Sequence, residues 1–448
     1  MFNKIGSIIQ RIGPGLRQVI GNTAWLFADK LWRMGLSLVV GVWVTRYLGP
    51  TQFGTLSYAM TFVSMFSAIA SLGGLSSLIV RDIARNPSCK DESLGTAFTL
   101  QLIGGFLTVL VTVAIIPILN PNDSLTQKLV AIIAAGTIFN AFGTIDFWFQ
   151  SQLQSKYTIF AKNFAYLLVA AVRLVLIQLH AGLIAFAWAR LAESAVGALG
   201  LLWVYRKQGN YIQAWRVSFQ RCKELLVESF PLVLAGVAVY VYANIDQVML
   251  GSILKEKKDE LGFYAAAVKL STVFDFLPMI LASSILPKLT QLKGKNNEEY
   301  LKKLQIYFDI STASWLAIAI PISILAPYIV PIVYGEEFRA SVPLLSVYAW
   351  SQFGSMFGVA RGTFLAIEGK LHYSLIMSVL GAFLNIGLNY FMIPAYGAMG
   401  ATVATLITYL FAIVLMNFLI KDLNIVGKLI LRSLNLYHAA LRLKGLLR

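Results

Sequence analysis

The chain has 448 residues, of which 58% are hydrophobic and 13% are charged, and its formal net charge is +16 at pH 7. Soluble domains contain about 25% charged residues, so this composition excludes a soluble globular protein and indicates an integral membrane protein. Met1–Gln18 is basic but has no small-residue cleavage site, so we predict no cleavable signal peptide. Cys89 and Cys222 fall in connections predicted to be cytoplasmic, where no disulfide is expected.

Apolar runs between Gly, Pro and charged breakers predict an all-α chain of about twelve transmembrane helices. In chain order they cover residues 21–47, 56–80, 95–119, 128–149, 159–180, 183–204, 230–253, 262–286, 305–326, 342–367, 373–394 and 397–420. The predicted organisation is a basic amphipathic N-terminal segment (1–20), an N-terminal lobe (21–204), a cytoplasmic linker (205–229), a C-terminal lobe (230–420) and a basic amphipathic cytoplasmic tail (421–448). In the tail, Leu and Ile alternate with Lys and Arg at helical spacing, which favours a helix lying on the membrane surface over a partner-binding segment.

The connection after the first span begins with a Gly49-Pro50 break, and the apolar pattern resumes after Gly54. The second half contains a weaker copy of this arrangement around Gly262. Gly54 and Gly262 are each followed five residues later by an alanine, Ala59 and Ala267 respectively. The repetition favours an internal duplication of a helix hairpin.

Lysine and arginine are concentrated in alternate connections, which places both termini in the cytoplasm by the positive-inside rule. A single connection on that side, the longest, contains five basic residues: Arg206, Lys207, Arg216, Arg221 and Lys223. All connections on the opposite side together contain no more than that: Arg46, Lys255, Lys257, Lys258 and Arg339. The basic excess is therefore a topology signal, with some attraction to anionic membrane lipids. It does not indicate binding to nucleic acid.

Charged side chains also lie within the predicted spans of the first half. Asp29 and Arg33 are four residues apart, so they can pair on one helix face, either as a structural pair or as part of a cavity lining. Arg190 and Glu193, three residues apart, allow the same two interpretations. Arg173 has no carboxylate at helical spacing, so we expect it to meet water, a partner on another helix or an anionic ligand.

The second half places Asp246, Lys269 and Asp275 within spans. Lys269 and Asp275 are six residues apart and do not share a helix face well, so mutual neutralisation is not expected. A carboxylate near the middle of the membrane, such as Asp275, could carry a proton. A structural salt bridge to another helix explains the same residue equally well.

Other polar groups in the spans have simpler explanations. Arg361 is near the predicted cytoplasmic end of its span, where its side chain could reach water. Lys162 is also close enough to a helix end to do so. Asn385 and Asn389, four residues apart, are more typical of interhelical hydrogen bonding than of a site.

Sequence features of catalysis are weak. No G-x-x-x-x-G-K-[ST] motif is present, the histidines His180, His372 and His438 are scattered, and no Cys/His cluster predicts a metal. The predicted external loops are short, whereas a membrane transferase, polymerase or ligase normally needs a larger acceptor-binding region. We therefore predict that the protein is not an enzyme.

Several ordered stretches resemble one family. They are RYLGPTQFGTLSYA (46–59), IDFWFQSQLQ (145–154), NIDQVMLG (244–251), ELGFYAAAVKL (260–270), ILPKLTQL (285–292) and NIGLNYFMIPAYGAMGATVAT (385–405). Together they resemble the Wzx-type polysaccharide and O-antigen flippases of the multidrug/oligosaccharidyl-lipid/polysaccharide exporter superfamily. The resemblance implies two pseudo-symmetric six-helix lobes around a central cavity that opens alternately to each side. It also implies that the protein moves an undecaprenyl-diphosphate-linked oligosaccharide across the bacterial inner membrane. Its expected partners are polysaccharide polymerase and export machinery.

A diphosphate cannot cross hydrocarbon without fixed cations, and arginine matches phosphate geometry in a bidentate manner. The predicted substrate-binding residues are Arg33, Arg173, Arg190, Lys269 and Arg361. Asp275 and Asp246 are predicted to couple transport to a proton or sodium gradient, and no other cofactor is expected.

Three alternatives remain open. A drug exporter of the same superfamily would need an acidic cavity for its cationic ligands, whereas the charges within the spans are mainly basic. A flippase for another lipid-linked precursor would share the diphosphate chemistry. A membrane-embedded transferase or ligase is the alternative from a different class, and a purely structural scaffold would gain nothing from charges at membrane depth.

Overall fold

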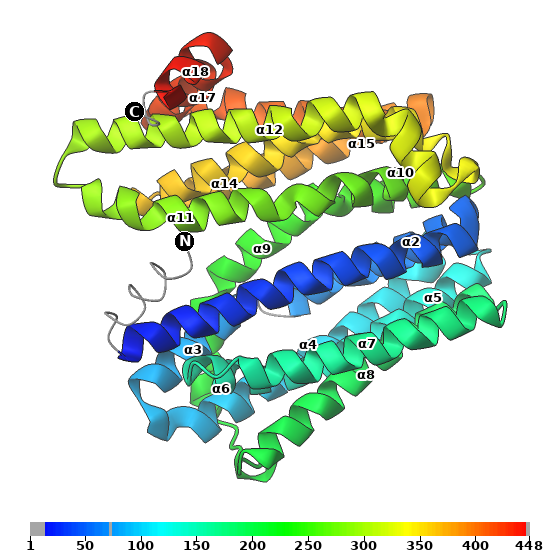
Figure 1. The fold of residues 1–448 in the computed structure, drawn as a ribbon. Coiled ribbons are helices and arrows are strands. Elements are labelled where there is room, and N and C mark those ends of the chain that lie inside the picture. Colours follow the sequence, from blue (N-terminus) through cyan, green and yellow to red (C-terminus); the bar gives the residue numbers. More distant parts are fainter. Residues whose placement is uncertain (1–13, 71–73, 445–448) are drawn as a thin grey trace, which may run out of the picture. The chain divides into compact units, whose positions relative to one another are not determined.

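The computed structural model describes residues 14–70 and 74–444, and within these ranges the chain is almost entirely helical and contains no strand (Figure 1). Most of the predicted N-terminal segment and the last four residues of the tail lie outside the described residues. Seven helices or helical runs in the described ranges are long and apolar enough to cross a membrane. They are Pro87–Leu119, Ser124–Ser151, Lys156–Gln178, Leu183–Lys207, Lys258–Leu292, Asn297–Tyr334 and His372–Leu419. The all-helical membrane fold class is thereby confirmed.

The chain forms two compact units, one made of Met1–Tyr47 and Phe62–Gly236 and the other of Leu48–Thr61 and Val237–Arg448. The helix α2 (Pro14–Ala70) contributes to both units, and α9 (Phe219–Ile253) runs from the first into the second. The first unit contains α3 (Leu75–Arg85), η1 (Pro87–Cys89), α4 (Lys90–Leu119), α5 (Ser124–Ala135), η2 (Gly136–Gly143), α6 (Thr144–Ser151), α7 (Lys156–Gln178), α8 (Leu183–Lys207) and η3 (Ile212–Ala214). The predicted domain boundaries stay predictions.

The second unit contains the remaining elements. In chain order they are α10 (Lys258–Ser271), η4 (Thr272–Asp275), α11 (Phe276–Leu292), α12 (Asn297–Tyr334), η5 (Glu336–Phe338), α13 (Ser341–Tyr348), η6 (Ala349–Ser351), α14 (Gln352–Ile367), α15 (His372–Leu410), η7 (Phe411–Leu415), α16 (Met416–Leu419), η8 (Lys421–Leu423), α17 (Asn424–Leu434) and α18 (Leu436–Lys444). Within this unit α14 packs against both α12 and α15 (Figure 1).

Glycines divide the two longest helices. In α2 the backbone leaves the helical region at Gly49 (φ 66°, ψ 175°), and in α15 it does so at Gly397 (φ 57°, ψ −138°). Residues with a Cβ rarely adopt such positive φ values, so glycine is required at both points. The break predicted at Gly49-Pro50 is confirmed, and the break at Gly397 falls at the first residue of the predicted span 397–420.

The two glycines that indicated a duplication meet in the second unit. A Cβ on Gly54 would lie 2.5 Å from the carbonyl oxygen of Lys258, and a Cβ on Gly262 would lie 1.9 Å from that of Pro50. The absence of side chains lets the backbones of α2 and α10 come into direct contact. Both glycines therefore have a packing function at the point where α2 and α10 cross.

The tail differs from the single surface helix that the sequence predicted. It forms two helices, α17 and α18, separated at Asn435, whose backbone is extended. Val426, Leu429 and Ile430 of α17 are buried, and both helices contact α12. Alternation of apolar and basic residues identified the apolar face of the tail, but it could not show that this face packs on the protein itself.

Candidate functional site

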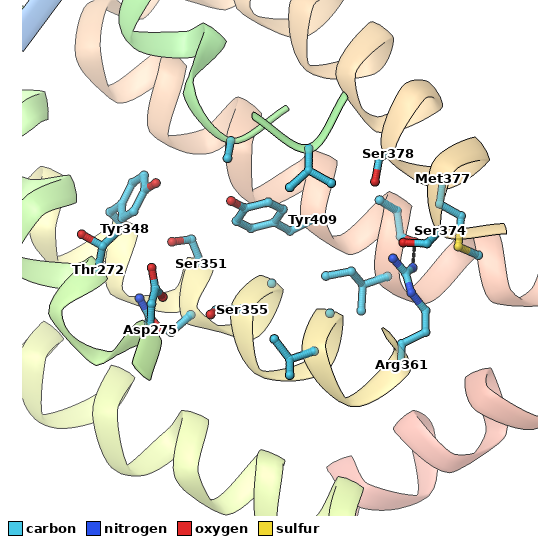
Figure 2. Close-up of a pocket in the computed structure, with 18 residues that line it drawn as sticks. Thr272, Asp275, Tyr348, Ser351, Ser355, Arg361, Ser374, Met377, Ser378 and Tyr409 are labelled. Atoms are coloured by element: carbon cyan, nitrogen blue, oxygen red, sulfur yellow. Dashed lines mark hydrogen bonds between the residues drawn. The ribbon is translucent and has the colours of Figure 1, made fainter. Parts of the chain in front are cut away.

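A cavity of about 320 Å³ lies within the second unit, between α9, the α10–α11 corner, the α13–α14 segment, the two ends of α15 and η7 (Figure 2). Three irregular turns line it: the 3₁₀ segments η4 and η6 and the π-helical segment η7. Such interruptions disturb the regular backbone hydrogen bonding of long helices and often occur at functional positions. Here they bring polar side chains and backbone atoms into an otherwise apolar bundle.

The polar side of the cavity gathers around Asp275. This residue ends η4, and its carboxyl group interacts with Ser355 and Gln352 of α14. Figure 2 shows Thr272, Ser351 and Ser355 close to Asp275 at one end of the cavity. A carboxylate with several hydroxyl groups nearby can receive a proton or a small cation, as the sequence analysis proposed for Asp275.

Arg361 lines the other end of the same cavity (Figure 2). Only 7% of the residue is exposed, and its Nη1 donates to the carbonyl oxygen of Ala412 at 2.5 Å. Ala412 lies in the π-helical segment η7, where the hydrogen-bonding pattern differs from that of an α-helix. The sequence expectation that Arg361 reaches water near a helix end is therefore wrong for this structure, because the side chain points into the protein.

Asp246 lies outside this cavity and is 2% exposed. Its carboxylate accepts hydrogen bonds from the Tyr264 hydroxyl, from the Thr405 hydroxyl at 3.1 Å and from the backbone N–H of Gln247 at 2.8 Å. All three donors are neutral. The ring of Tyr264 contacts the ring of Tyr348, a residue of the cavity wall, at a centroid distance of 5.8 Å.

Asparagine side chains form a short ladder within α15. Asn389 donates to Asn385 at 2.8 Å, and Asn385 donates to Thr408 at 3.4 Å across the break at Gly397. The ladder thus joins the two predicted spans that α15 contains, in agreement with the expected interhelical hydrogen bonding.

Lys269 is in the last turn of α10, and its ammonium group lies 5.5 Å from the centroid of the Phe53 ring. A cation over an aromatic face is attracted by the quadrupole of the ring. Both residues belong to the second unit. Lys269 does not line the cavity that contains Asp275 and Arg361.

In the first unit, Arg173 and Arg190 share one carboxylate. Nη2 of Arg173 on α7 lies 2.6 Å from Oε2 of Glu193 on α8, and Nη1 of Arg190 lies 3.1 Å from Oε1 of the same residue. The side chains of Arg173 and Glu193 are 15% and 18% exposed, whereas that of Arg190 is 50% exposed. Two guanidinium groups and one carboxylate leave the cluster with a surplus positive charge.

Arg33 pairs with Asp29 at 2.9 Å on α2, as their spacing allowed. Asn163 of α7 also donates to Asp29, at 2.7 Å. Nη2 of Arg33 is buried and has no hydrogen-bond partner among the residues that the structure describes. The pair is therefore neutral overall but keeps an unused donor.

One polar cluster was missed by the sequence analysis. Lys162, interpreted as reaching toward a helix end, forms an ion pair of 2.6 Å with Asp146, which also accepts hydrogen bonds from Thr158 and Gln150. Asp146 and Lys162 are sixteen residues apart on different helices, so no helical spacing indicated their contact. In total, the structure brings Arg173 and Arg190 onto one carboxylate and places Asp275 and Arg361 at opposite ends of one cavity. Arg33, Lys269 and Asp246 lie in separate surroundings.

The apolar helical runs and the fold define the class of the protein as a multi-pass membrane protein. The chain is similar to the inward-facing conformation of a multidrug resistance MATE family transporter of the MOP superfamily, with a TM-score of 0.71 and 18% identity over 92% of this chain and 95% of the other. It is similar to the lipid II flippase MurJ in an inward closed conformation, with a TM-score of 0.68 and 15% identity over 93% and 91% of the two chains. Identities this low show the fold alone.

A sequence model of the family described as "Polysaccharide biosynthesis protein" matches residues 43–343, which is more than half of the chain. The chain belongs to this family, and the predicted relationship to polysaccharide flippases is confirmed. It is also 25% identical over 194 residues to the probable low-salt glycan biosynthesis flippase Agl15 of Haloferax volcanii. That match spans 43% of this chain and 40% of the relative's length.

Proposed function

We propose that the protein is a flippase that moves an undecaprenyl-diphosphate-linked oligosaccharide across the bacterial inner membrane by alternating access, without catalysing a reaction. Membership of the polysaccharide biosynthesis family and similarity to a glycan biosynthesis flippase support a lipid-linked substrate. In this proposal both termini are cytoplasmic, and the glycan passes to polysaccharide polymerase and export machinery. A proton or sodium gradient drives the cycle.

The observation that carries the proposal is the surplus positive charge at Glu193. A purely structural ion pair in a membrane helix needs equal numbers of cations and carboxylates, because an extra charge adds a desolvation cost without a compensating partner. Here Arg173 occupies one carboxylate oxygen and Arg190 the other. The half-exposed guanidinium of Arg190 keeps donors available for an anion.

The diphosphate of the proposed substrate is an anion that fits this surplus positive charge. A diphosphate accepts paired hydrogen bonds from a guanidinium, and charge-assisted hydrogen bonds are about twice as strong as neutral ones. Arg33, Lys269 and Arg361 are the further cations that we assign to the diphosphate or its glycan. Asp246, held by neutral donors only, and Asp275 are the groups that we assign to ion coupling.

The test is leaflet-to-leaflet movement of a fluorescent undecaprenyl-diphosphate oligosaccharide in liposomes that contain the purified protein. Arg190→Gln removes the surplus charge and should slow translocation by about tenfold or more, since a hydrogen bond to a charged group contributes about 1.5–3 kcal/mol. Arg206→Gln, at the exposed end of the same helix, is the matched control and should transport normally. Equal transport by wild type and both variants would keep the flippase but remove this site.

A small-molecule exporter is the second candidate, and the cavity that contains Asp275 favours it, because carriers of organic cations need a carboxylate. It predicts no movement of the lipid-linked oligosaccharide under any imposed ion gradient. It also predicts efflux of a cationic dye that Asp275→Asn abolishes and Arg190→Gln leaves unchanged. The same liposomes therefore separate the two candidates.

A further inference from the structure

A second cavity lies within the second unit, where the tail helices α17 and α18 cover the first turns of α12. Its volume is about 910 Å³. Arg442 of α18 anchors the tail there, since its Nε and Nη2 donate to the two carboxylate oxygens of Asp309 on α12 at 2.7 and 2.8 Å. The side chain of Asp309 is completely buried. The ion pair between Arg442 and Asp309 thus fixes the position of α18 beside the cavity.

The lining of this cavity is strongly basic. Its charged or titratable side chains are Lys302, Lys428, Arg432, His438 and Arg442. Arg442 is neutralised by Asp309, whereas Lys302, Lys428 and Arg432 form no ion pair with any residue that the structure describes. These three side chains are exposed around the cavity, so together they give it a positive potential that attracts anions. The charge pattern therefore favours a ligand with a phosphate group.

Gln305 holds one wall of the cavity in place. The residue lines the cavity and is 8% exposed, and its Nε2 donates to Oδ1 of Asp309 at 2.9 Å and to the carbonyl oxygen of Leu429 at 3.2 Å. Both of these partners are acceptors, so the amide orientation is fixed by its surroundings. Its Oε1 is buried and lacks a hydrogen-bond partner among the described residues. The oxygen is enclosed by the protein, so the contribution of Gln305 to the cavity is to tie α12 to α17.

The tail also presents apolar side chains to the surroundings of the cavity. Leu431 and Leu434 of α17 and Leu436, Tyr437 and Leu441 of α18 are all exposed large hydrophobic residues. Helices that combine exposed leucines with lysines and arginines lie at the boundary between lipid headgroups and acyl chains. Basic pockets at this level bind anionic headgroups.

We propose that the cavity between α12, α17 and α18 binds the headgroup of an anionic phospholipid, such as phosphatidylglycerol. Lys302, Lys428 and Arg432 hold its phosphodiester. The acyl chains lie along the exposed leucines of the tail. Free glycerol phosphate also supplies a phosphate group but gains nothing from these leucines, so the lipid is the favoured source.

The experiment measures binding of short-chain fluorescent phosphatidylglycerol to the purified full-length protein in detergent. The variant Lys428→Gln/Arg432→Gln should bind it about tenfold or more weakly, since each cation near an anionic headgroup adds roughly 1 kcal/mol. The matched control Lys421→Gln/Lys444→Gln removes two exposed tail cations that do not line the cavity and should bind normally. Thermal unfolding of each variant verifies that the tail remains folded.

Two further arms test the charge of the headgroup and the source of the phosphate. Phosphatidylcholine has the phosphodiester but no net charge, so wild type should bind phosphatidylglycerol more tightly and the Lys428→Gln/Arg432→Gln variant should lose that preference. Glycerol 3-phosphate should compete only at far higher concentration than the lipid. Unchanged binding by the cavity variant, equal loss in the control variant, or displacement of the lipid by equimolar glycerol 3-phosphate would each overturn the proposal.

Discussion

Replacing Gly262 by alanine tests the backbone contact between α2 and α10. A Cβ at this position would lie 1.9 Å from the carbonyl oxygen of Pro50 and 2.6 Å from its carbonyl carbon. These are backbone atoms, so no flexible side chain can move away, and the helices have to separate. Overpacking of a well-packed contact typically costs about 1–3 kcal/mol. For a unit of this size that corresponds to a decrease in Tm of about 2–12 °C.

The assay is thermal unfolding of the purified protein in detergent, followed by tryptophan fluorescence at a fixed scan rate. Gly387→Ala is the control, because α15 leaves open space around Gly387 and alanine is the better helix former there. Gly54→Ala should also lower the Tm. Since its Cβ would lie 2.7 Å from the backbone nitrogen of Gly262, the double variant should lose less than the sum of the single losses. An unchanged Tm for Gly262→Ala would refute the contact.

Three further predictions concern stability. Partial burial raises the pKa of Asp82, but hydrogen bonds from arginines, including Arg221, outweigh it and hold the pKa below its usual value. The stability that these bonds contribute should be present at neutral pH and lost as the pH falls below about 4. In unfolding experiments, Asp82→Asn should cost about 1–3 kcal/mol at pH 7 and abolish that pH dependence. Arg442→Gln should leave the buried Asp309 carboxylate without its partner, at a cost of about 3–5 kcal/mol, and should make the tail sensitive to limited proteolysis. Gly49→Ala should lower the Tm by forcing alanine to a φ of 66°, a strain of about 1–3 kcal/mol.

Helix positions and helix breaks were predictable because their signals are local. The Gly49-Pro50 dipeptide interrupts the apolar pattern within a few residues, and the structure breaks α2 at the same place. Within the described residues, helical runs cover the predicted spans for the same reason, since about 20 apolar residues in sequence can satisfy their backbone in a membrane only as a helix. The close approach of Gly54 and Gly262 depends on segments two hundred residues apart, and sequence similarity between them gave only an indirect indication.

The candidate site was predictable only where both partners lie on one helix. Spacings of four and three residues correctly paired Asp29 with Arg33 and Glu193 with Arg190. The second contact of Glu193, with Arg173, crosses from α8 to α7, and no rule of helical spacing applies across two helices. The irregular segment η7 was likewise invisible in sequence, so the burial of Arg361 against it could not be foreseen.

How each buried charge is satisfied distinguishes structural groups from groups that can change their state. Lys162 and Asp146 neutralise each other directly, and such a pair cannot release either charge without leaving the other unpaired. Asp246 instead accepts hydrogen bonds from two hydroxyl groups and one backbone N–H, all of them neutral. Hydroxyl groups can reorient when a carboxylate gains a proton or a cation, whereas a paired ammonium cannot become an acceptor. A transporter that couples substrate movement to an ion needs a carboxylate of the second kind, and this contrast is why we assign coupling to Asp246 rather than to Asp146.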